Sequence, residues 1–250
     1  MKSRNTLRVL LCVAVSIPCF AMQSNPAPIA QEMALDHFDH EHNLARKEEL
    51  LRGITEQFTG CGPDLVRLAE KIDQVDTKWM AIRGMSKLHF AGAADFLQKS
   101  LGDKNSAIRA NAARALGELR IQRSGEPMIL MFKEDYDIGV LDQASVALVV
   151  LHAREAVPLI KDKIRKYPAA RAWLLGALGG IGDRDDVAFL AQYLWLDSTE
   201  AGSAAAAIQR ITGVRFSGPL SPIGGGPQSS PSPAVLKARA WWKAHEAEYP

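Results

Sequence analysis

Apolar residues recur along this chain with the spacing of an amphipathic helix, and the same stripe returns every 30 to 32 positions. Within residues 106–119, Ala112, Leu116 and Leu119 follow i, i+4 and i+7, which places them on one face of a helix. Four other segments carry the stripe in phase, and the three resulting columns are Ala81, Ala112, Ala144, Leu174 and Ala204; Met85, Leu116, Leu148, Leu178 and Ile208; and Leu88, Leu119, Leu151, Ile181 and Ile211. The pattern predicts a helical unit present in about five copies.

A second set of apolar columns falls between those of the first set and steps in phase with them. Its members are Leu97, Met128, Ile160 and Leu190, and then Leu101, Phe132, Ile164 and Leu194. Each unit therefore holds two helices, and such a pair cannot bury both of its apolar faces without a neighbour. We predict an all-α fold in which about five helix pairs stack into an α-solenoid over residues 77–213.

The segment before the repeats has apolar residues at helical spacing but does not share the columns. We predict that residues 22–76 form an N-terminal helical cap, with one long helix from Glu32 to Phe58 and a shorter helix after Cys61. Polar outer faces on such caps keep a solenoid from stacking end to end.

The segment after the repeats changes composition twice. Residues 214–233 are so rich in Gly, Pro and Ser that we expect an irregular linker. Residues 234–250 then read as a helix that carries Trp241 and Trp242. Because large apolar side chains usually find cover, we expect this helix to fold back on the last repeats as a cap. The alternative is an exposed helix that docks on another molecule.

Two stretches carry a family resemblance. One is the run from Asp103 to Leu119, and the other is the run from Ala177 to Asp183, which ends in a Gly-Asp turn. Both resemble the short HEAT-like repeats also found in phycobilin lyases, over about residues 77–213 and more loosely 50–76. The resemblance implies the helical scaffold and no particular chemistry, since one scaffold hosts many functions. HEAT-repeat hydroxylases carry adjacent His and Glu as iron ligands, whereas neither His89 nor His152 is followed by Glu.

The first residues have the layout of a secretory signal peptide: a basic start, an apolar stretch from Val9 to Phe20 and small residues around a cleavable bond. We predict a signal peptide over residues 1–21 and an exported bacterial protein, periplasmic or secreted. The apolar stretch is shorter than the roughly 20 residues of a membrane span, so no span is expected. Removing 1–21 changes the formal charge from +2 to −1, which argues against nucleic-acid binding.

A cluster of potential metal ligands lies near the new N-terminus. On a helix, His37, His40 and Glu41 fall at i, i+3 and i+4, close enough to share a transition-metal ion. A solvated helix face is the alternative interpretation, because no second ligand-bearing helix is evident.

Catalytic signatures are missing from the sequence. Nucleophilic catalysis needs a Ser or Cys with a base, and neither a Gly-x-Ser-x-Gly motif nor a cysteine-protease motif is present. The run from Gly179 to Gly182 ends a helix, whereas a phosphate cradle precedes one. We therefore expect neither an enzyme nor a cofactor.

The second helix of each pair is expected to line the concave side of the solenoid, where repeat proteins bind partners. Polar and aromatic residues that lie off the core columns there form a candidate partner-binding ridge. Its members are Lys161, Lys163, Arg165, Lys166, Gln192, Tyr193 and Trp195. Tyr, Trp and Arg are residue types that anchor protein interfaces, although charged helix faces are also common without a partner.

These patterns favour a non-enzymatic binding or scaffold protein of the bacterial cell envelope that holds a protein partner. A metal-binding envelope protein that uses the His37, His40 and Glu41 cluster is the alternative. A purely structural domain that docks through its C-terminal helix is a further alternative.

Overall fold

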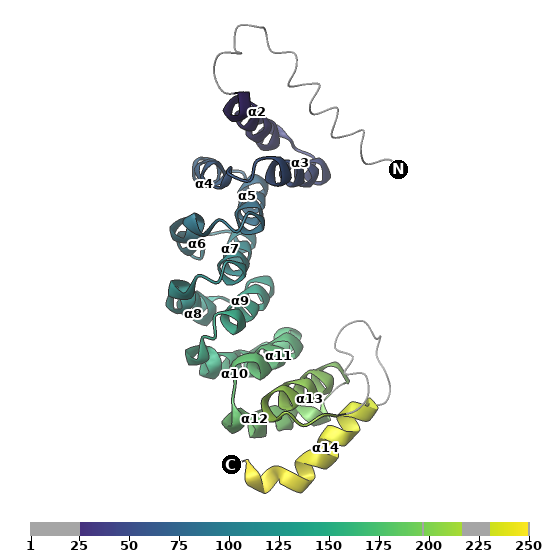
Figure 1. The fold of residues 1–250 in the computed structure, drawn as a ribbon. Coiled ribbons are helices and arrows are strands. Elements are labelled where there is room, and N and C mark those ends of the chain that lie inside the picture. The colour runs from purple at the N-terminus through teal and green to yellow at the C-terminus, as the bar shows by residue number, and fades with distance from the viewer. Residues whose placement is uncertain (1–25, 197, 217–230, 250) are drawn as a thin grey trace, which may run out of the picture. The chain divides into compact units, whose positions relative to one another are not determined.

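The computed structural model describes residues 26–196, 198–216 and 231–249 (Figure 1). The predicted signal peptide and most of the predicted linker lie outside these residues. Within them the secondary structure is helical and contains no strand, so the fold is the predicted all-α solenoid of stacked helix pairs. The chain divides into two compact units, residues 1–100 and 101–250, and each is described by itself.

The first unit contains four longer helices followed by a short 3-10 turn and a short helix. Their bounds are α2 (Pro26–His40), α3 (Leu44–Gln57), α4 (Gly62–Lys71), α5 (Val75–Lys87), η2 (Ala91–Ala93) and α6 (Ala94–Ser100). The prediction of one helix from Glu32 to Phe58 is wrong, because the chain breaks between His40 and Leu44. Asn43 causes the break: its side chain accepts a hydrogen bond from the Arg46 amide and so starts α3 as an N-cap.

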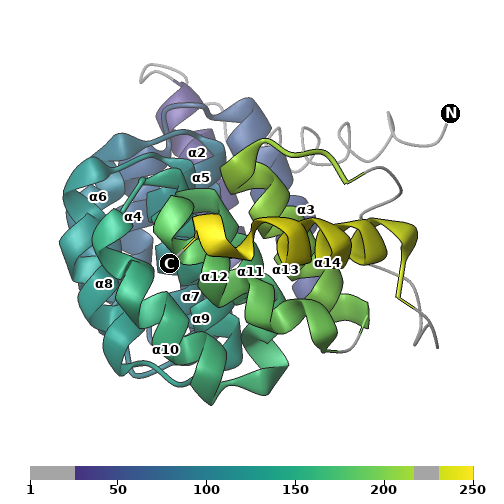
Figure 2. The same cartoon turned by 90° about the horizontal axis from the view of Figure 1, so that it is seen from below.

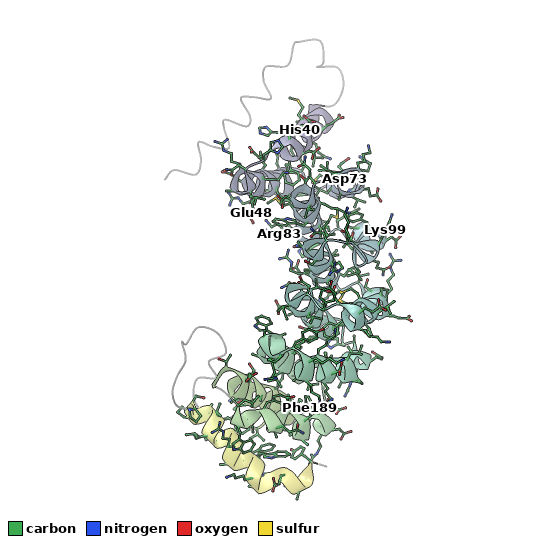
Figure 3. The ribbon with its side chains drawn as sticks, turned by 180° about the vertical axis from the view of Figure 1, so that it is seen from behind. His40, Glu48, Asp73, Arg83, Lys99 and Phe189 are labelled. Carbon is green, nitrogen blue, oxygen red and sulfur yellow. The ribbon has the colours of Figure 1, made fainter. Side chains whose placement is uncertain are left out.

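Helix α5 packs closely on α3 and α4. A Cβ atom added at Gly84 would lie 2.9 Å from a methyl carbon of Leu51 and 2.9 Å from one of Leu65, so a glycine is needed at this crossing. An ion pair between Arg83 and Glu48, 2.8 Å from Nη1 to Oε1, also joins α5 to α3 (Figure 3). The helical cap therefore has a core of its own.

A lysine is buried inside this cap. The ammonium group of Lys47 in α3 donates to the hydroxyl of Thr77 in α5 and lies 5.5 Å from the centre of the Phe38 ring in α2. Burial lowers the pKa of Lys47 below its usual value. This side chain ties three helices together, and its apolar stem packs in the core while its ammonium group reaches a polar partner.

The second unit continues the alternation of longer helices and short 3-10 turns to the end of the chain. Its elements are α7 (Ser106–Glu118), η3 (Gln122–Ser124), α8 (Gly125–Glu134), α9 (Ile138–Val150), η4 (Arg154–Ala156), α10 (Val157–Lys166), η5 (Pro168–Ala170), α11 (Arg171–Ile181), η6 (Arg184–Asp186), α12 (Val187–Ala191), η7 (Gln192–Trp195), α13 (Ser198–Thr212), α14 (Pro233–His245) and η8 (Glu246–Glu248).

Two layers form this unit. Helices α7, α9, α11 and α13 make one layer and α8, α10 and α12 make the other (Figure 1). Seen along the stack, α8 and α10 lie on the outer rim and α9 and α11 lie on the inner side of the curve (Figure 2). The expectation that second helices line the concave side is therefore wrong for this unit, because its inner layer consists of the first helices.

Two of the three first-helix columns and both second-helix columns form the core of the second unit, as predicted, whereas Leu119 and Ile211 of the third column are only partly buried. Each of the following residues is fully buried, with no exposed surface: Ala112, Leu116, Ala144, Leu148, Leu174, Leu178, Ala204 and Ile208 in the inner layer, and Met128, Phe132, Ile160, Ile164, Leu190 and Leu194 in the outer layer. Burying one such side chain stabilises a fold by roughly 1.5–3 kcal/mol. The in-phase columns are thus the main source of stability.

The turns inside two helix pairs of the second unit, α7–α8 and α9–α10, use a left-handed residue that is not glycine. Arg120 and His152 have φ angles of 52° and 55°, and they occupy matching places one residue after Leu119 and Leu151. Each lies in a Schellman motif, in which the next amide donates back to a carbonyl five residues earlier, as from Ala153 to Leu148 at 3.0 Å. Backbone amides therefore satisfy the last carbonyls of these helices.

The C-terminal helix folds back on its own chain. Helix α14 packs against α13 and η7, and Arg239 donates from Nε to the carbonyl of Leu194 at 2.7 Å. The ring of Trp241 lies 5.8 Å from that of Phe216 and 5.6 Å from that of Tyr249, measured between centres. The C-terminal helix thus covers the last repeat, as expected for a helix that carries two tryptophans.

Candidate protein-binding surface

Lys163 is not part of an exposed ridge, contrary to the prediction. Its side chain is only 5% exposed, and Nζ donates to the carbonyl of Asp135 at 2.5 Å. It also lies over the rings of Phe132 and Tyr167, 5.9 and 5.2 Å from their centres. Burial lowers the pKa of Lys163. Lys163 therefore stabilises the stack and cannot contact a partner.

Asp135, whose backbone carbonyl accepts from Lys163, forms a buried ion pair through its carboxylate. Both carboxylate oxygens of Asp135 accept hydrogen bonds from Arg109, at 2.6 Å from Nε and 3.1 Å from Nη2. Burial by itself raises the pKa of Asp135, but these hydrogen bonds outweigh it and hold the pKa below its usual range. Together with the Lys163 contact, this pair joins α7, the end of α8 and α10. Sequence reasoning missed it, although Arg109 and Asp135 both lie at helix boundaries.

Tyr193 is also buried, contrary to the prediction. It is 9% exposed, its ring lies 5.3 Å from that of Phe189, and the Arg171 guanidinium lies 5.8 Å from its centre. Burial raises the pKa of the Tyr193 hydroxyl. Its ring belongs to the packing of α12, so it is unavailable to a partner.

Three cations of α10 have partners within the chain. Lys161 forms an ion pair with Asp186, and both Lys161 and Arg165 lie over the ring of Phe189, 5.5 and 4.9 Å from its centre. Lys166 pairs with Asp162 at 2.9 Å. Lys161 and Arg165 therefore join α10 to the next repeat, although Arg165 and Lys166 remain exposed.

The last two residues of the predicted ridge are exposed but lie apart from a cationic surface. Gln192 is exposed on η7. Trp195 is 47% exposed, and its ring faces the Arg239 guanidinium of α14 at 5.9 Å. Trp195 thus belongs to the junction of η7 with the C-terminal helix.

The predicted metal ligands His37, His40 and Glu41 line one open pocket at the end of α2. Helix α2 ends at His40, whose Nδ1 lies 2.9 Å from the carbonyl of Asp36 (Figure 3). The carboxylate of Glu41 accepts a hydrogen bond from the Asn43 amide at 2.8 Å, which lowers the pKa of Glu41. His37 is exposed. Among the residues that the structure describes, no group of three or more His, Cys, Asp or Glu side chains is placed to hold a metal ion.

A different surface combines exposed apolar side chains with a cation on the inner layer. Trp173 of α11 is 48% exposed and Val146 of α9 is 55% exposed. Gly176 lies one helical turn after Trp173, and a Cβ atom added there would meet no atom within 4 Å. Arg210 of α13 reaches across and donates from Nη1 to the Gly176 carbonyl at 3.0 Å. We call Val146, Trp173, Gly176 and Arg210 the α11 notch.

The repeat explains why Val146 and Gly176 share a surface. They follow the buried Ala144 and Leu174 of their own helices by two positions, so they occupy equivalent places on the solvent-facing side of neighbouring helices. Solvent-facing positions of this kind are usually polar. The apolar residues at such positions were the signal in the sequence that could have revealed the notch.

The charge on the notch is not compensated within the described part of the chain. Arg210 is exposed, and no carboxylate there lies within ion-pair distance of it. Arg114, a surface cation of α7, differs, because it donates to Asn111 at 2.8 Å and lies 3.9 Å from Glu118. The notch can therefore offer an apolar contact and a free guanidinium side by side.

Stacked helix pairs with a continuous apolar core and an exposed apolar surface on one layer define a helical repeat protein with a scaffold or interaction role. Residues 63–149 match the family model for HEAT repeats, which supports a HEAT-like repeat protein. No curated protein sequence matches the chain. No helix within the described ranges has the length and apolar character needed to cross a membrane.

Proposed function

We propose that this protein is a non-enzymatic scaffold of the bacterial cell envelope that holds a protein partner on the inner layer of its second unit. The observation that carries the proposal is the exposure of Trp173 and Val146 on neighbouring helices of that layer. Large apolar side chains exposed together, with an arginine beside them, have the composition of an interface hot spot. The HEAT repeats support an interaction role in general.

The support for an envelope location is the signal-peptide pattern in the sequence. The basic start, apolar stretch and small residues of positions 1–21 have the order of a cleavable signal. Fractionation of cells that produce the full chain tests this part, with mass determination of the product. We expect a shortened protein in the periplasm or medium; a full-length product that stays in the cytoplasm would contradict it.

Capture from envelope extract tests the binding surface. The full chain serves as bait beside the variants Trp173→Ala and Val146→Asp, and Lys166→Ala on the outer layer is the matched control. We expect the two inner-layer variants to lose the captured partner while the control retains it. Equal capture by all four baits, each with unchanged circular dichroism, would remove the inner layer as the binding surface.

A further inference from the structure

We infer that the α11 notch binds an acidic peptide segment of the partner, with an apolar side chain between Trp173 and Val146 and a neighbouring carboxylate on Arg210. The inference rests on the proposed function, because it names the chemistry of the segment held by the same inner layer. Its basis is the juxtaposition of an open glycine, two exposed apolar side chains and an uncompensated guanidinium.

Gly176 provides the open space of the notch. With no atom within 4 Å of an added Cβ, this glycine makes no close helix contact that would require its small size. Gly179, three residues later, differs, since its added Cβ would lie 2.5 Å from the Cα of Ala207. The space above Gly176 is thus open to solvent, and Trp173 stands one turn away on the same helix face. A side chain of moderate size from another molecule fits there.

Arg210 provides the positive charge of the notch. A guanidinium has five N–H donors in a planar fork, and the structure records one hydrogen bond, from Nη1 to the Gly176 carbonyl. That bond holds the guanidinium over the notch and leaves donors for a second acceptor. Carboxylates match this fork in shape and charge. An arginine such as Arg171 differs, because Glu200 at 2.7 Å already compensates its charge.

The open space at Gly176 and the charge of Arg210 together define the occupant. An uncharged apolar segment would leave Arg210 beside apolar surface with no partner for its charge, and an acidic segment without apolar residues would leave Trp173 and Val146 in water. A segment that has both groups within a few residues satisfies both requirements.

Selection from a random dodecapeptide library displayed on phage tests the inference with the purified full chain as bait. The enriched peptides are then synthesised and their affinity is measured for the unchanged chain and for Arg210→Gln, Trp173→Ala and Gly176→Leu. The last substitution places a large side chain in the notch, at a position where an added Cβ meets no atom within 4 Å. Lys133→Gln, which removes an exposed cation from the outer layer, is the matched control.

We expect enriched peptides to carry Asp or Glu next to apolar residues. Their affinity should fall about ten-fold or more in all three notch variants and stay unchanged in the control, as loss of a hot-spot contact predicts. Peptides that lack acidic residues, or that bind Arg210→Gln as well as the unchanged chain, overturn the inference. If those peptides still depend on Trp173, the proposed function stands. If no peptide is enriched, or none depends on Trp173, both fail.

Discussion

Gly117 of α7 and Ala147 of α9 meet with almost no side-chain atoms between their backbones. A Cβ atom added to Gly117 would lie 2.8 Å from the Cβ and 2.9 Å from the Cα of Ala147. Gly179 of α11 and Ala207 of α13 repeat this contact two helices later. In α9, the position equivalent to Gly117 and Gly179 holds Val149 in place of glycine. The side chain of Val149 packs over Gly180 of α11. Close approaches therefore alternate with a wider one along the inner layer.

The first prediction concerns this close approach. Gly179→Ala should destabilise the protein by about 1–3 kcal/mol, because its new Cβ would overlap backbone that cannot move aside. Gly176→Ala, in the same helix, is the matched control and should stabilise by about 0.5–1 kcal/mol, since alanine favours the helix and meets no atom. Urea denaturation of both variants measures the difference. Equal effects would show that the α11 and α13 backbones are not in contact.

The second prediction concerns the buried ion pair of Arg109 and Asp135. Arg109→Met should cost about 3 kcal/mol, because it leaves the Asp135 carboxylate buried without its bidentate partner. Arg114→Met, one turn further along α7, removes a more exposed arginine and should cost less than about 1 kcal/mol. Chemical denaturation at neutral pH distinguishes the two. A small cost for both would mean that Asp135 does not depend on Arg109.

Acid titration adds a signed test of the same pair. Since the folded protein holds the pKa of Asp135 below its usual range, ionised Asp135 contributes stability at pH values above about 4. That contribution should disappear as the pH falls through the lowered, folded-state pKa. In Arg109→Met the pKa is no longer held down, so this part of the acid dependence should be absent.

The third prediction uses the single cysteine of the described residues. Cys61 has no exposed surface, and burial raises the pKa of its thiol from 9.0 to about 11. A raised folded-state pKa contributes stability below pH 9 that is lost as the pH rises toward 11, by about 2–3 kcal/mol. Cys61→Ala should lack this loss. The difference between the unfolding free energies of the unchanged protein and Cys61→Ala should therefore narrow as the pH rises from 9 to 11. Rapid reaction of native Cys61 with a thiol reagent at pH 8 would contradict its burial.

The fourth prediction concerns the left-handed turns. Arg120→Gly and His152→Gly should each stabilise the protein by about 1 kcal/mol or slightly less, because glycine adopts positive φ without the Cβ penalty. Arg114→Gly, in the middle of α7, should instead destabilise by about 1 kcal/mol through lost helix propensity. Thermal unfolding of the three variants compares them. Destabilisation by all three would mean that positions 120 and 152 are not left-handed in solution.

The core of the fold was predictable from sequence because it depends on period alone. A residue such as Leu116 or Leu148 repeats in phase with its neighbours, and any helix that carries the column must bury it to stack. The break between α2 and α3 was less predictable. Asn43 can end one helix and begin another, yet asparagine also occurs inside longer helices, so the apolar spacing alone suggested a single element.

The candidate site was not predictable in the same way. Lys163 and Tyr193 carry polar groups, which suggested exposure, but long amphipathic side chains can lie along apolar surface and bring their polar ends to an internal partner. Whether such a partner exists depends on a residue from another repeat, such as Asp135 for Lys163. Helical periodicity contains no information about that partner.

The sequence by itself determined that this chain is a stack of helix pairs, and which apolar residues form its core, because the 30-to-32-residue columns admit one consistent burial pattern. Only the tertiary structure decided which layer lies on the inner side of the second unit and which charges are already paired. Both depend on how neighbouring helices approach one another, as at Gly179 and Ala207. That packing buries Lys163 and leaves Trp173 and Arg210 exposed on one surface.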